Sequence, residues 1–293
     1  MLRKLTLTAA TALGLLAPGL ATAAGGEAHV TDYDFPFEGP FGSFDTNQLQ
    51  RGLQIYTEIC AGCHGLHYVA FRNLSDEGGP ALPEDQMRAY AAQFFIADAD
   101  NNDELIDPDT GDFREPTPTD KFPRNHTQGA PDLSLMAKAR AGFHGPYGLG
   151  VNQFLKGMGG PEYIASLLAH YEETPECAAD ANMSGYYNTV FEPGGYPESC
   201  LDEDGERTVP GSWIGMAPPL SDGAIEFADG HANDVESMSK DVAAFLMWTA
   251  EPKLVARKQA GLTGVIFLVI LSVLLYLTNK RIWAPHKKAV KES

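Results

Sequence analysis

The sequence has little positive charge and few cysteines. Of its 293 residues only 21 are Lys or Arg, against 39 Asp or Glu, and the formal net charge is −18. A chain with this balance is unsuited to a phosphate backbone, so we exclude a nucleic-acid-binding protein. Gly and Pro together contribute about 17% of the residues, above the usual share of roughly 12% but below the roughly 25–30% typical of low-complexity disorder. We therefore expect a folded chain that is rich in loops.

Long apolar runs are also scarce, and the first of the two lies at the N-terminus. It covers residues 5–20, follows Arg3 and Lys4, and precedes Ala21-Thr22-Ala23. This order is typical of a secretory signal peptide, which we assign to residues 1–24 and expect to be cleaved. The alternative is a membrane anchor, which the short length and the interruption at Pro18 disfavour.

The second apolar run covers residues 259–279, which carry no charge. Twenty-one residues of helix span the roughly 30 Å hydrocarbon core of a bilayer. A buried core helix is the alternative, but apolar residues occupy every face, which favours a transmembrane helix exposed to lipid. Tyr276 and Trp283 lie where an aromatic belt would be.

The topology follows from the signal peptide. Residues 25–258 would be exported, which in a bacterium would make them a periplasmic domain, and residues 280–293 would stay in the cytoplasm as a basic tail on the inner membrane. The positive-inside pattern is less decisive, because Lys253, Arg257 and Lys258 flank the exported side of the span. Divided in this way, residues 25–258 hold 14 basic and 38 acidic residues, a net charge of −24.

Two of the four cysteines belong to Cys60-Ala61-Gly62-Cys63-His64, the C-x-x-C-H pattern of covalent c-type haem attachment. The two thiols add to the haem vinyl groups, and the adjacent imidazole then reaches the iron. The alternatives are half of a zinc site, which lacks its second Cys/His pair, and a thioredoxin-like redox pair, which does not need the His. One such motif predicts one haem c.

The other two cysteines, Cys177 and Cys200, are most simply a disulfide in an oxidising compartment. Closing a loop of about 24 residues would stabilise the fold by about 3 kcal/mol. A redox-active pair is the alternative, which the long separation disfavours.

The second axial ligand decides between electron transfer and an open iron, and methionine raises the reduction potential. Met216 is our candidate, because two prolines in Gly215-Met216-Ala217-Pro218-Pro219-Leu220 restrict the backbone around it. Met158 and Met183 remain alternatives, and Met216 could instead be a core residue. We give surface or capping roles to the histidines at 67, 126, 144 and 170.

Two amphipathic helices are predicted on either side of these ligands, over residues 47–59 and 234–249. In c-type cytochromes generally, a helix before the haem motif crosses a helix after the methionine loop. Gly52 offers a close crossing point for the helix that carries Phe245.

In its motifs the chain resembles one family, cytochrome c1, the haem subunit of the cytochrome bc1 complex, over nearly all of residues 30–285. The resemblance implies a mainly α, c-type cytochrome fold enlarged by long loop insertions, with one C-terminal transmembrane helix. The motifs that carry it are C-A-G-C-H-G-L-H-Y-V-A-F-R-N-L at 60–74, G-A-P-D-L-S at 129–134, A-R at 139–140, G-G-P-E-Y at 159–163, G-M-A-P-P-L at 215–220 and W-T-A-E-P at 248–252.

The resemblance assigns roles residue by residue. It implies Cys60 and Cys63 as thioether attachments and His64 and Met216 as axial ligands, and the second cysteine pair resembles the disulfide of bacterial members. It also implies that three residues contact the haem propionates, namely Asn125, Arg140 and Tyr163. Arg140 could instead favour the end of a helix that begins at residues 131–132, and Tyr163 could be a packed aromatic.

One stretch departs from the mitochondrial members. Residues 98–112 form an acidic insertion whose Asp98, Asp100 and Asn102 imitate a calcium loop, but Asp103 occupies the position that requires Gly. We interpret this stretch as a solvated loop.

The implied function is electron transfer from a Rieske iron–sulfur protein to a soluble basic cytochrome c, beside cytochrome b in a dimeric, quinol-oxidising complex. Two other classes stay open. One is an independent membrane-tethered electron shuttle or oxidase subunit, and the other is a haem sensor with an open iron.

Overall fold

The computed structural model describes residues 30–94, 111, 114–140 and 157–292. The predicted signal peptide, the acidic insertion apart from Gly111, and His144 lie outside the described residues. The elements are α2 (Thr46–Glu58), η1 (Cys60–Gly62), η2 (Phe71–Ser75), α3 (Glu84–Ala91), α4 (Met136–Ala139), α6 (Gly160–Ala169), η4 (Glu176–Ala178), β1 (Tyr186–Asn188), η5 (Glu198–Cys200), β2 (Ser212–Ile214), α7 (Val235–Ala250) and α8 (Leu254–Glu292). The protein is therefore mainly helical, as the sequence predicted.

Helix α2 is the helix predicted before the haem motif, within one residue at each end. The Asp45 side chain accepts a hydrogen bond from the backbone N–H of Gln48, and this N-cap starts the helix. Leu49, Leu53 and Tyr56 recur at helical spacing and are all buried. The helix thus presents one apolar stripe to the core.

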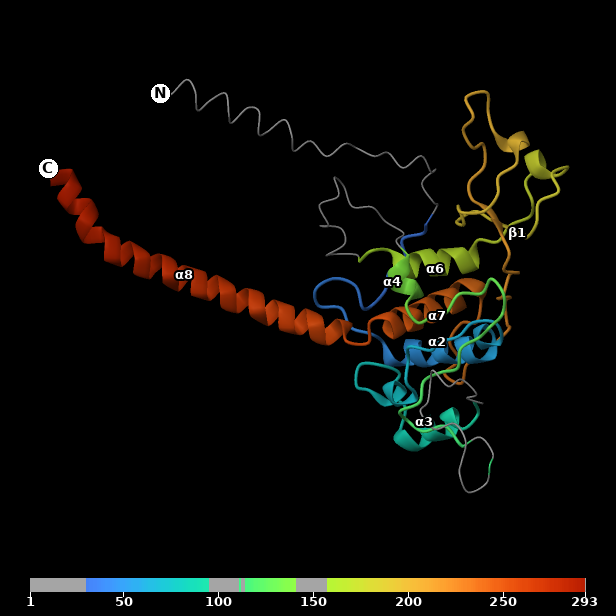
Figure 1. Ribbon diagram of the computed structural model, residues 1–293, viewed down its shortest axis with the longest axis horizontal. Coiled ribbons are helices and arrows are strands. Elements are labelled where there is room, and N and C mark those ends of the chain that lie inside the picture. The colour runs from blue at the N-terminus through green and yellow to red at the C-terminus, as the bar shows by residue number, and fades with distance from the viewer. Residues whose placement is uncertain (1–29, 95–110, 112–113, 141–156, 293) are drawn as a thin grey trace.

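Helix α7 matches the second predicted helix and crosses α2. Asp234 caps it through the backbone N–H of Ser237. A Cβ placed on Gly52 would lie 2.3 Å from the carbonyl oxygen of Asp241 and 2.5 Å from the Cβ of Phe245. Only glycine allows the two backbones to approach so closely, which confirms the predicted crossing point. The two helices lie side by side in Figure 1.

An ion-pair cluster locks this crossing. Arg51 Nε lies 2.6 Å from Asp241, whose carboxylate is buried, and Arg51 Nη1 lies 2.7 Å from Asp229. The loop that follows Met216 is held against α2 as well, because Gln54 donates to the carbonyl of Glu226. Leu220 and Phe227 from the same loop enter the core that α2 and α7 share.

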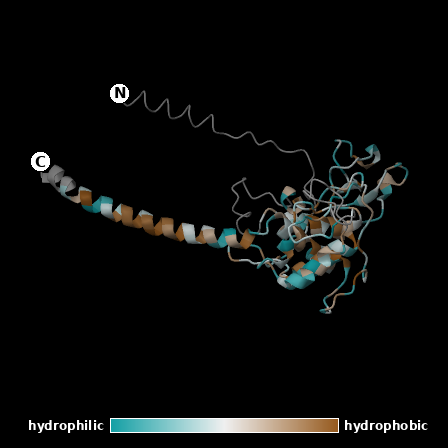
Figure 2. Ribbon diagram, turned by 60° about the horizontal axis from the view of Figure 1, so that its bottom comes forward, coloured by the Kyte–Doolittle hydropathy of each residue, from teal (hydrophilic) through white to brown (hydrophobic). Residues whose placement is uncertain are grey.

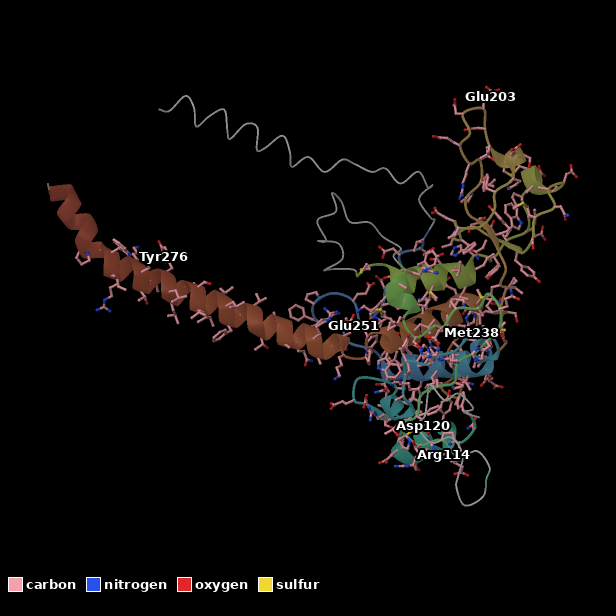
Figure 3. All side chains as sticks on the ribbon, viewed as in Figure 1. Arg114, Asp120, Glu203, Met238, Glu251 and Tyr276 are labelled. Carbon is pink, nitrogen blue, oxygen red and sulfur yellow. A yellow bond between two sulfur atoms is a disulfide. The ribbon has the colours of Figure 1, made fainter. Side chains whose placement is uncertain are left out.

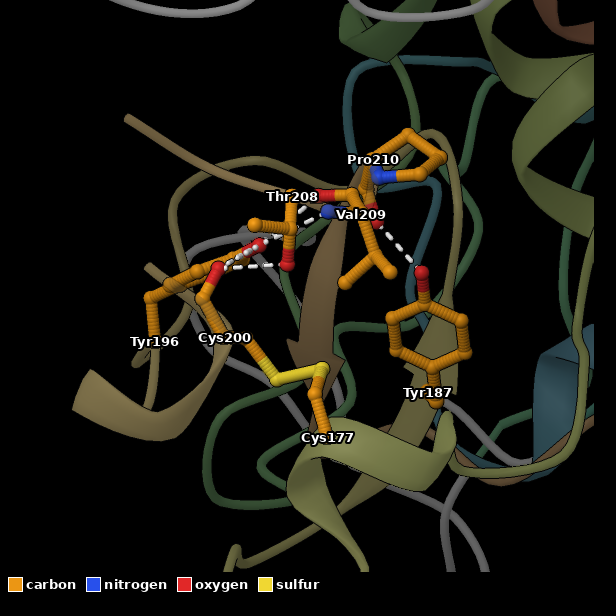
Figure 4. The surroundings of a disulfide bond; sticks show 7 residues. All are labelled: Cys177, Tyr187, Tyr196, Cys200, Thr208, Val209 and Pro210. Carbon is orange, nitrogen blue, oxygen red and sulfur yellow. Dashed lines mark hydrogen bonds between the residues drawn. A yellow bond between two sulfur atoms is a disulfide. The ribbon is translucent and has the colours of Figure 1, made fainter. Parts of the chain in front are cut away.

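A second, smaller cluster lies on the far side of the head from α8 (Figure 1). Its strands β1 and β2 pair antiparallel, with Tyr187 opposite Trp213. The disulfide Cys177–Cys200, with a Cα–Cα distance of 5.1 Å, lies beside them, with Cys200 buried and Cys177 partly buried. Hydroxyl groups complete the cluster: that of Tyr187 donates to the Pro210 carbonyl, and that of Tyr196 donates to the Val209 carbonyl (Figure 4).

Helix α8 leaves the head and extends away from it as a single transmembrane helix (Figure 1). Leu254–Pro285 is the stretch long and apolar enough to span a bilayer, with a mean hydropathy of 2.5 in its most apolar window. Apolar residues fill the middle of the helix in Figure 2. Its first residue, Leu254, is buried in the head, so the helix starts inside the packed domain.

Candidate haem site

The haem-attachment segment folds back on itself directly after α2. The carbonyl of Cys60 accepts hydrogen bonds from the backbone N–H groups of both Cys63 and His64, at 3.1 and 2.9 Å. The Tyr56 hydroxyl donates to the His64 carbonyl at 3.0 Å and ties the turn to α2. This turn gathers two thiols and one imidazole at the end of a single helix, which is the donor set that covalent haem attachment requires.

The two thiols differ in their surroundings. Cys60 packs against the main core, whereas Cys63 is exposed, and no disulfide joins them. Burial, followed by the neighbouring Cys63, raises the pKa of the Cys60 thiol to about 12. A thiol that stays protonated at neutral pH is a poor partner for thiol–disulfide exchange, which disfavours the redox-pair alternative.

His64 is oriented by a backbone carbonyl. Its Nδ1 lies 2.7 Å from the carbonyl oxygen of Pro131, and because a carbonyl only accepts, Nδ1 carries the proton. The lone pair is then on Nε2, the atom that faces away from this bond. A second-shell acceptor of this kind fixes the tautomer and ring orientation of a histidine that binds a metal.

The segment that supplies this carbonyl is held firmly against the haem motif. The backbone N–H of Leu133 donates to the carbonyl of Gly65 at 2.9 Å. A Cβ on Gly65 would lie 2.9 Å from the backbone nitrogen of Asn125 and 3.0 Å from the carbonyl oxygen of Pro123. Glycine at position 65 therefore permits three backbone segments to meet beside His64.

His67 also contacts the 131–134 segment, and its side chain does not point into solvent. Both its backbone N–H and its Nδ1 approach Asp132 Oδ2, at 3.0 and 3.1 Å. Burial opposes ionisation of Asp132, but hydrogen bonds from Ser134 and His67 hold its pKa below the usual range. His67 therefore serves to bind residues 131–134.

The predicted surface and capping roles fit two other histidines. His126 is exposed, and His170 ends α6 with its Nδ1 2.8 Å from the Ser166 carbonyl.

Asn125 clamps the attachment loop. Its Nδ2 donates to the carbonyl oxygens of Ala61 and Gly62, at 3.2 and 3.0 Å, and its Oδ1 accepts from Thr127. These contacts hold the two residues between the cysteines. The implied contact with a haem propionate remains a prediction that these hydrogen bonds do not address.

Arg140 and Tyr163 come close together, although the helix expected before Arg140 is largely absent. The prediction of a helix from residues 131–132 was wrong: α4 is only Met136–Ala139, and Arg140 ends it in an extended conformation, exposed. Asp132 Oδ1 accepts from the Ser134 N–H as an N-cap would, but Oδ2 accepts from His67 and the Leu133 N–H donates to the Gly65 carbonyl, so the segment is held against residues 65–67 and no helix begins before Met136. Because α4 has only one turn, its helix dipole is too small to explain why an arginine stands at position 140.

The approach of α4 to α6 brings the pair together. A Cβ on Gly160 would lie 1.8 Å from the Ala137 carbonyl oxygen and 2.9 Å from that of Arg140. Burial raises the pKa of Tyr163, and the positive charge of Arg140 acts in the opposite direction. A cation and a phenol within electrostatic reach suit a shared carboxylate partner such as a propionate.

Tyr171 holds the Met216 loop, because its hydroxyl donates a hydrogen bond to the Met216 carbonyl at 3.1 Å. Burial raises the pKa of this phenol, so it remains a donor at any physiological pH. Met216 itself is half-buried. Its loop continues into Leu220, which packs in the main core with α2.

The remaining described methionines are accounted for elsewhere. Met158 is 49% exposed, and Met183 packs in the disulfide cluster with its terminal methyl against Gly195. Four others lie in or against the main core, namely Met87, Met136, Met238 and Met247. Met216 therefore stands out among the described methionines as half-buried and in neither cluster.

Sequence reasoning missed three contributors to this site. The carbonyl of Pro131 and the hydroxyl of Tyr171 contact the proposed ligands His64 and Met216, and the carboxylate of Asp132 binds His67 beside them. Pro131 and Asp132 lie within a motif already noted at 129–134, but a main-chain acceptor leaves no trace in side-chain type. The geometry alone identifies it.

Comparison with known proteins gives a consistent result. The model of the Cytochrome C1 family matches residues 35–286. Cytochrome c1 of Cereibacter sphaeroides is 59% identical over 286 residues, which cover 97% of this chain and 96% of the relative. The mitochondrial cytochrome c1 heme protein of Saccharomyces cerevisiae is 33% identical over 269 residues, or 90% of this chain and 75% of the relative. A longer protein named cytochrome b/c1, from Bradyrhizobium diazoefficiens, is 39% identical over 85% of this chain and 34% of its own length.

Proposed function

The chain belongs to the cytochrome c1 family, and from this membership we propose that it carries one covalently attached haem c and transfers electrons within a quinol-oxidising, proton-translocating bc1 complex beside cytochrome b. The proposed donor is a Rieske iron–sulfur protein, and the proposed acceptor is a soluble basic cytochrome c. Both partners follow from the family and are open to test. The contact between His64 Nδ1 and the Pro131 carbonyl is the observation that carries the proposal, because it prepares an imidazole as a ligand.

Attachment would use Cys60 and Cys63. Each thiol would hold the haem through a carbon–sulfur bond to one vinyl group, and its hydrogen would go to the neighbouring carbon, so that no oxidant would be needed. The Asn125 clamp and the bonds to the Cys60 carbonyl hold the two thiols on one turn during this reaction.

His64, through Nε2, and Met216, through its sulfur, are the residues that would hold the haem iron. When bound, the haem supplies an iron that alternates between the ferric and ferrous states without making or breaking bonds to substrate. The Pro131 carbonyl retains the Nδ1 proton and raises the basicity of the ligand, while the Met216 thioether favours a high reduction potential. Arg140 and Tyr163 would bind the propionates.

The acidic head would attract the acceptor. A domain with a net charge of −24 over residues 25–258 can accelerate encounter with a basic carrier about ten- to thousand-fold at low salt. This effect suits an exported head with the C-terminal tail in the cytoplasm, which is the topology we propose for a bacterial inner membrane.

The axial assignment is tested by Met216→Leu in the full chain. We expect covalent haem to be retained while the reduction potential falls strongly, because thioether ligation is lost. Redox titration measures the shift, and Met158→Leu and Met183→Leu serve as matched controls that leave the potential unchanged. An unchanged potential in Met216→Leu would assign the ligand to another residue.

The docking proposal is tested by ionic strength. We expect the second-order rate of electron transfer to a basic cytochrome c to fall at least about tenfold from low to high salt. Stopped-flow absorbance gives this rate, and a carrier of low net charge is the control. A rate that is independent of salt with the basic carrier would contradict electrostatic docking.

A membrane-tethered shuttle remains the alternative, and the root of α8 disfavours it. Leu254 is 5% exposed, so the head joins its span without a flexible tether. Purification in mild detergent through a C-terminal tag distinguishes the two. Copurification of a multi-span dihaem protein and an iron–sulfur protein supports the bc1 proposal, and a lone cytochrome refutes it.

A further inference from the structure

Three cations on the head side of the span, Lys253, Arg257 and Lys258, run against the positive-inside pattern, and the structure gives two of them another role. The Nε of Arg257 donates to Glu251, and the Nζ of Lys258 donates to the carbonyl of Phe37. Glu251 lies at the root of α8 (Figure 3) and is also 3.2 Å from Lys138 Nζ. These contacts and the burial of Leu254 make the first turn of α8 a part of the head.

The loop of residues 38–42 is seated on this turn. The Phe37 ring is buried beneath it, stacked on Phe35, while its carbonyl binds Lys258. The loop then closes tightly, because a Cβ on Gly42 would lie 1.9 Å from the Glu38 carbonyl oxygen. At its tip Phe41 is 80% exposed, the most exposed large apolar side chain among the described residues.

The height of this loop relative to the bilayer follows from Lys258. The uncharged stretch of α8 begins at the next residue, Gln259, and a lysine at such a boundary keeps its ammonium group in the headgroup layer. Since that ammonium group binds the Phe37 carbonyl, the loop is held at the same level. A bilayer that surrounds α8 therefore reaches the tip of the loop.

We propose that residues 38–42 form a membrane-seating loop, in which Phe41 inserts into the phospholipid interface of the leaflet on the side of the head. The occupant of the Phe41 site is lipid, because the loop is bound through the Phe37 carbonyl to the start of a span whose own side chains are exposed from Gln259 to Pro285. Aromatic side chains are favoured at this depth. Two points of contact, α8 and the loop, would fix the tilt of the head over the membrane.

The test uses the full chain in vesicles of phosphatidylcholine and phosphatidylglycerol. Phe41→Cys is labelled with a nitroxide, and its collision rates with oxygen and with a water-soluble nickel chelate are measured by power saturation. Tyr186→Cys is the matched control, because Tyr186 is 48% exposed and lies in β1, on the far side of the head (Figure 1). The parent chain, labelled in parallel, gives the background.

We expect the ratio of oxygen to nickel accessibility to be at least fivefold higher at position 41 than at position 186. Equal ratios at the two positions would overturn the proposal. Protection of position 41 only when the other subunits of a complex are present would also overturn it, in favour of a protein partner. The measurement does not use the haem, so its outcome is independent of the proposed electron transfer.

Discussion

The head contains two buried clusters that are held together in different ways. Around the crossing of α2 and α7, large apolar side chains such as Tyr56, Phe245 and Trp248 pack with almost no exposure. Around Cys177–Cys200 the buried apolar cluster has only four members, and loops rather than helices surround them. Apolar area stabilises the first cluster, whereas the second depends on a covalent bond and on hydroxyl groups bonded to carbonyls.

This difference shows what each cluster can tolerate. A cluster built on close packing is sensitive to volume, since interiors are packed as densely as organic crystals. A small cluster buries little apolar area, so burial contributes little to its stability. It depends more on a disulfide, which lowers the conformational entropy of the unfolded chain. Substitutions that change volume should therefore damage the first, and loss of the disulfide should damage the second.

The largest effect is expected at Gly52. Gly52→Ala adds a methyl group only 2.3 Å from the Asp241 carbonyl oxygen, which forces α2 and α7 apart. Despite the better helix propensity of Ala, we expect the free energy of unfolding to fall by about 3 kcal/mol, with loss of haem incorporation. Urea denaturation followed by absorbance measures both.

Gly264→Ala is the matched control, because it adds a methyl group to another helical glycine with no neighbour within 4 Å. It should leave the denaturation midpoint unchanged. If Gly52→Ala behaved like this control, the close crossing of α2 and α7 would not determine stability.

The second effect is confined to the cluster around the Cys177–Cys200 disulfide. Replacing both cysteines in Cys177→Ala/Cys200→Ala should destabilise residues 176–214 by about 3 kcal/mol and leave the helix crossing intact. Amide hydrogen exchange should show faster exchange in β1 and β2 with unchanged protection in α2 and α7. Uniformly faster exchange throughout the head would show that the clusters are not independent.

The remaining effect depends on pH and concerns an acid inside the apolar cluster. Glu162 is buried and hydrogen-bonded to Glu38, and burial and then Glu38 raise its pKa well above the usual range. The folded state therefore keeps a proton that the unfolded state releases, and stability is lost as pH rises from about 4.5 through the folded pKa. The slope cannot exceed about 1.4 kcal/mol per pH unit for one proton.

Glu162→Gln should remove this slope, because the amide keeps its hydrogen-bonding capacity without ionising. Urea midpoints between pH 5.5 and 8.5 measure the change, with the exposed Glu198→Gln as control. A slope that persists in Glu162→Gln would assign the proton to a different group.

Periodicity was sufficient to predict α2 and α7, the long uncharged apolar run predicted α8, and the glycine at position 52 located the crossing. It was insufficient for β1 and β2, because three-residue strands show no alternation. The helix predicted from residue 131 was wrong because Asp132 bonds to His67, 65 residues away in sequence. Contacts over such separations depend on the folded backbone, and the pattern of side chains does not encode them.

The acceptor for His64 has a genetic consequence. A main-chain oxygen is supplied by every amino acid, so no point substitution at position 131 deletes the atom that retains the imidazole proton. Amino-acid replacement at position 131 is constrained only by the backbone conformation of the turn. The tautomer of His64 is therefore unaffected by mutations that would remove a side-chain partner, and heritable loss of this proposed iron ligand must arise at His64 itself or through displacement of the whole 131–134 segment.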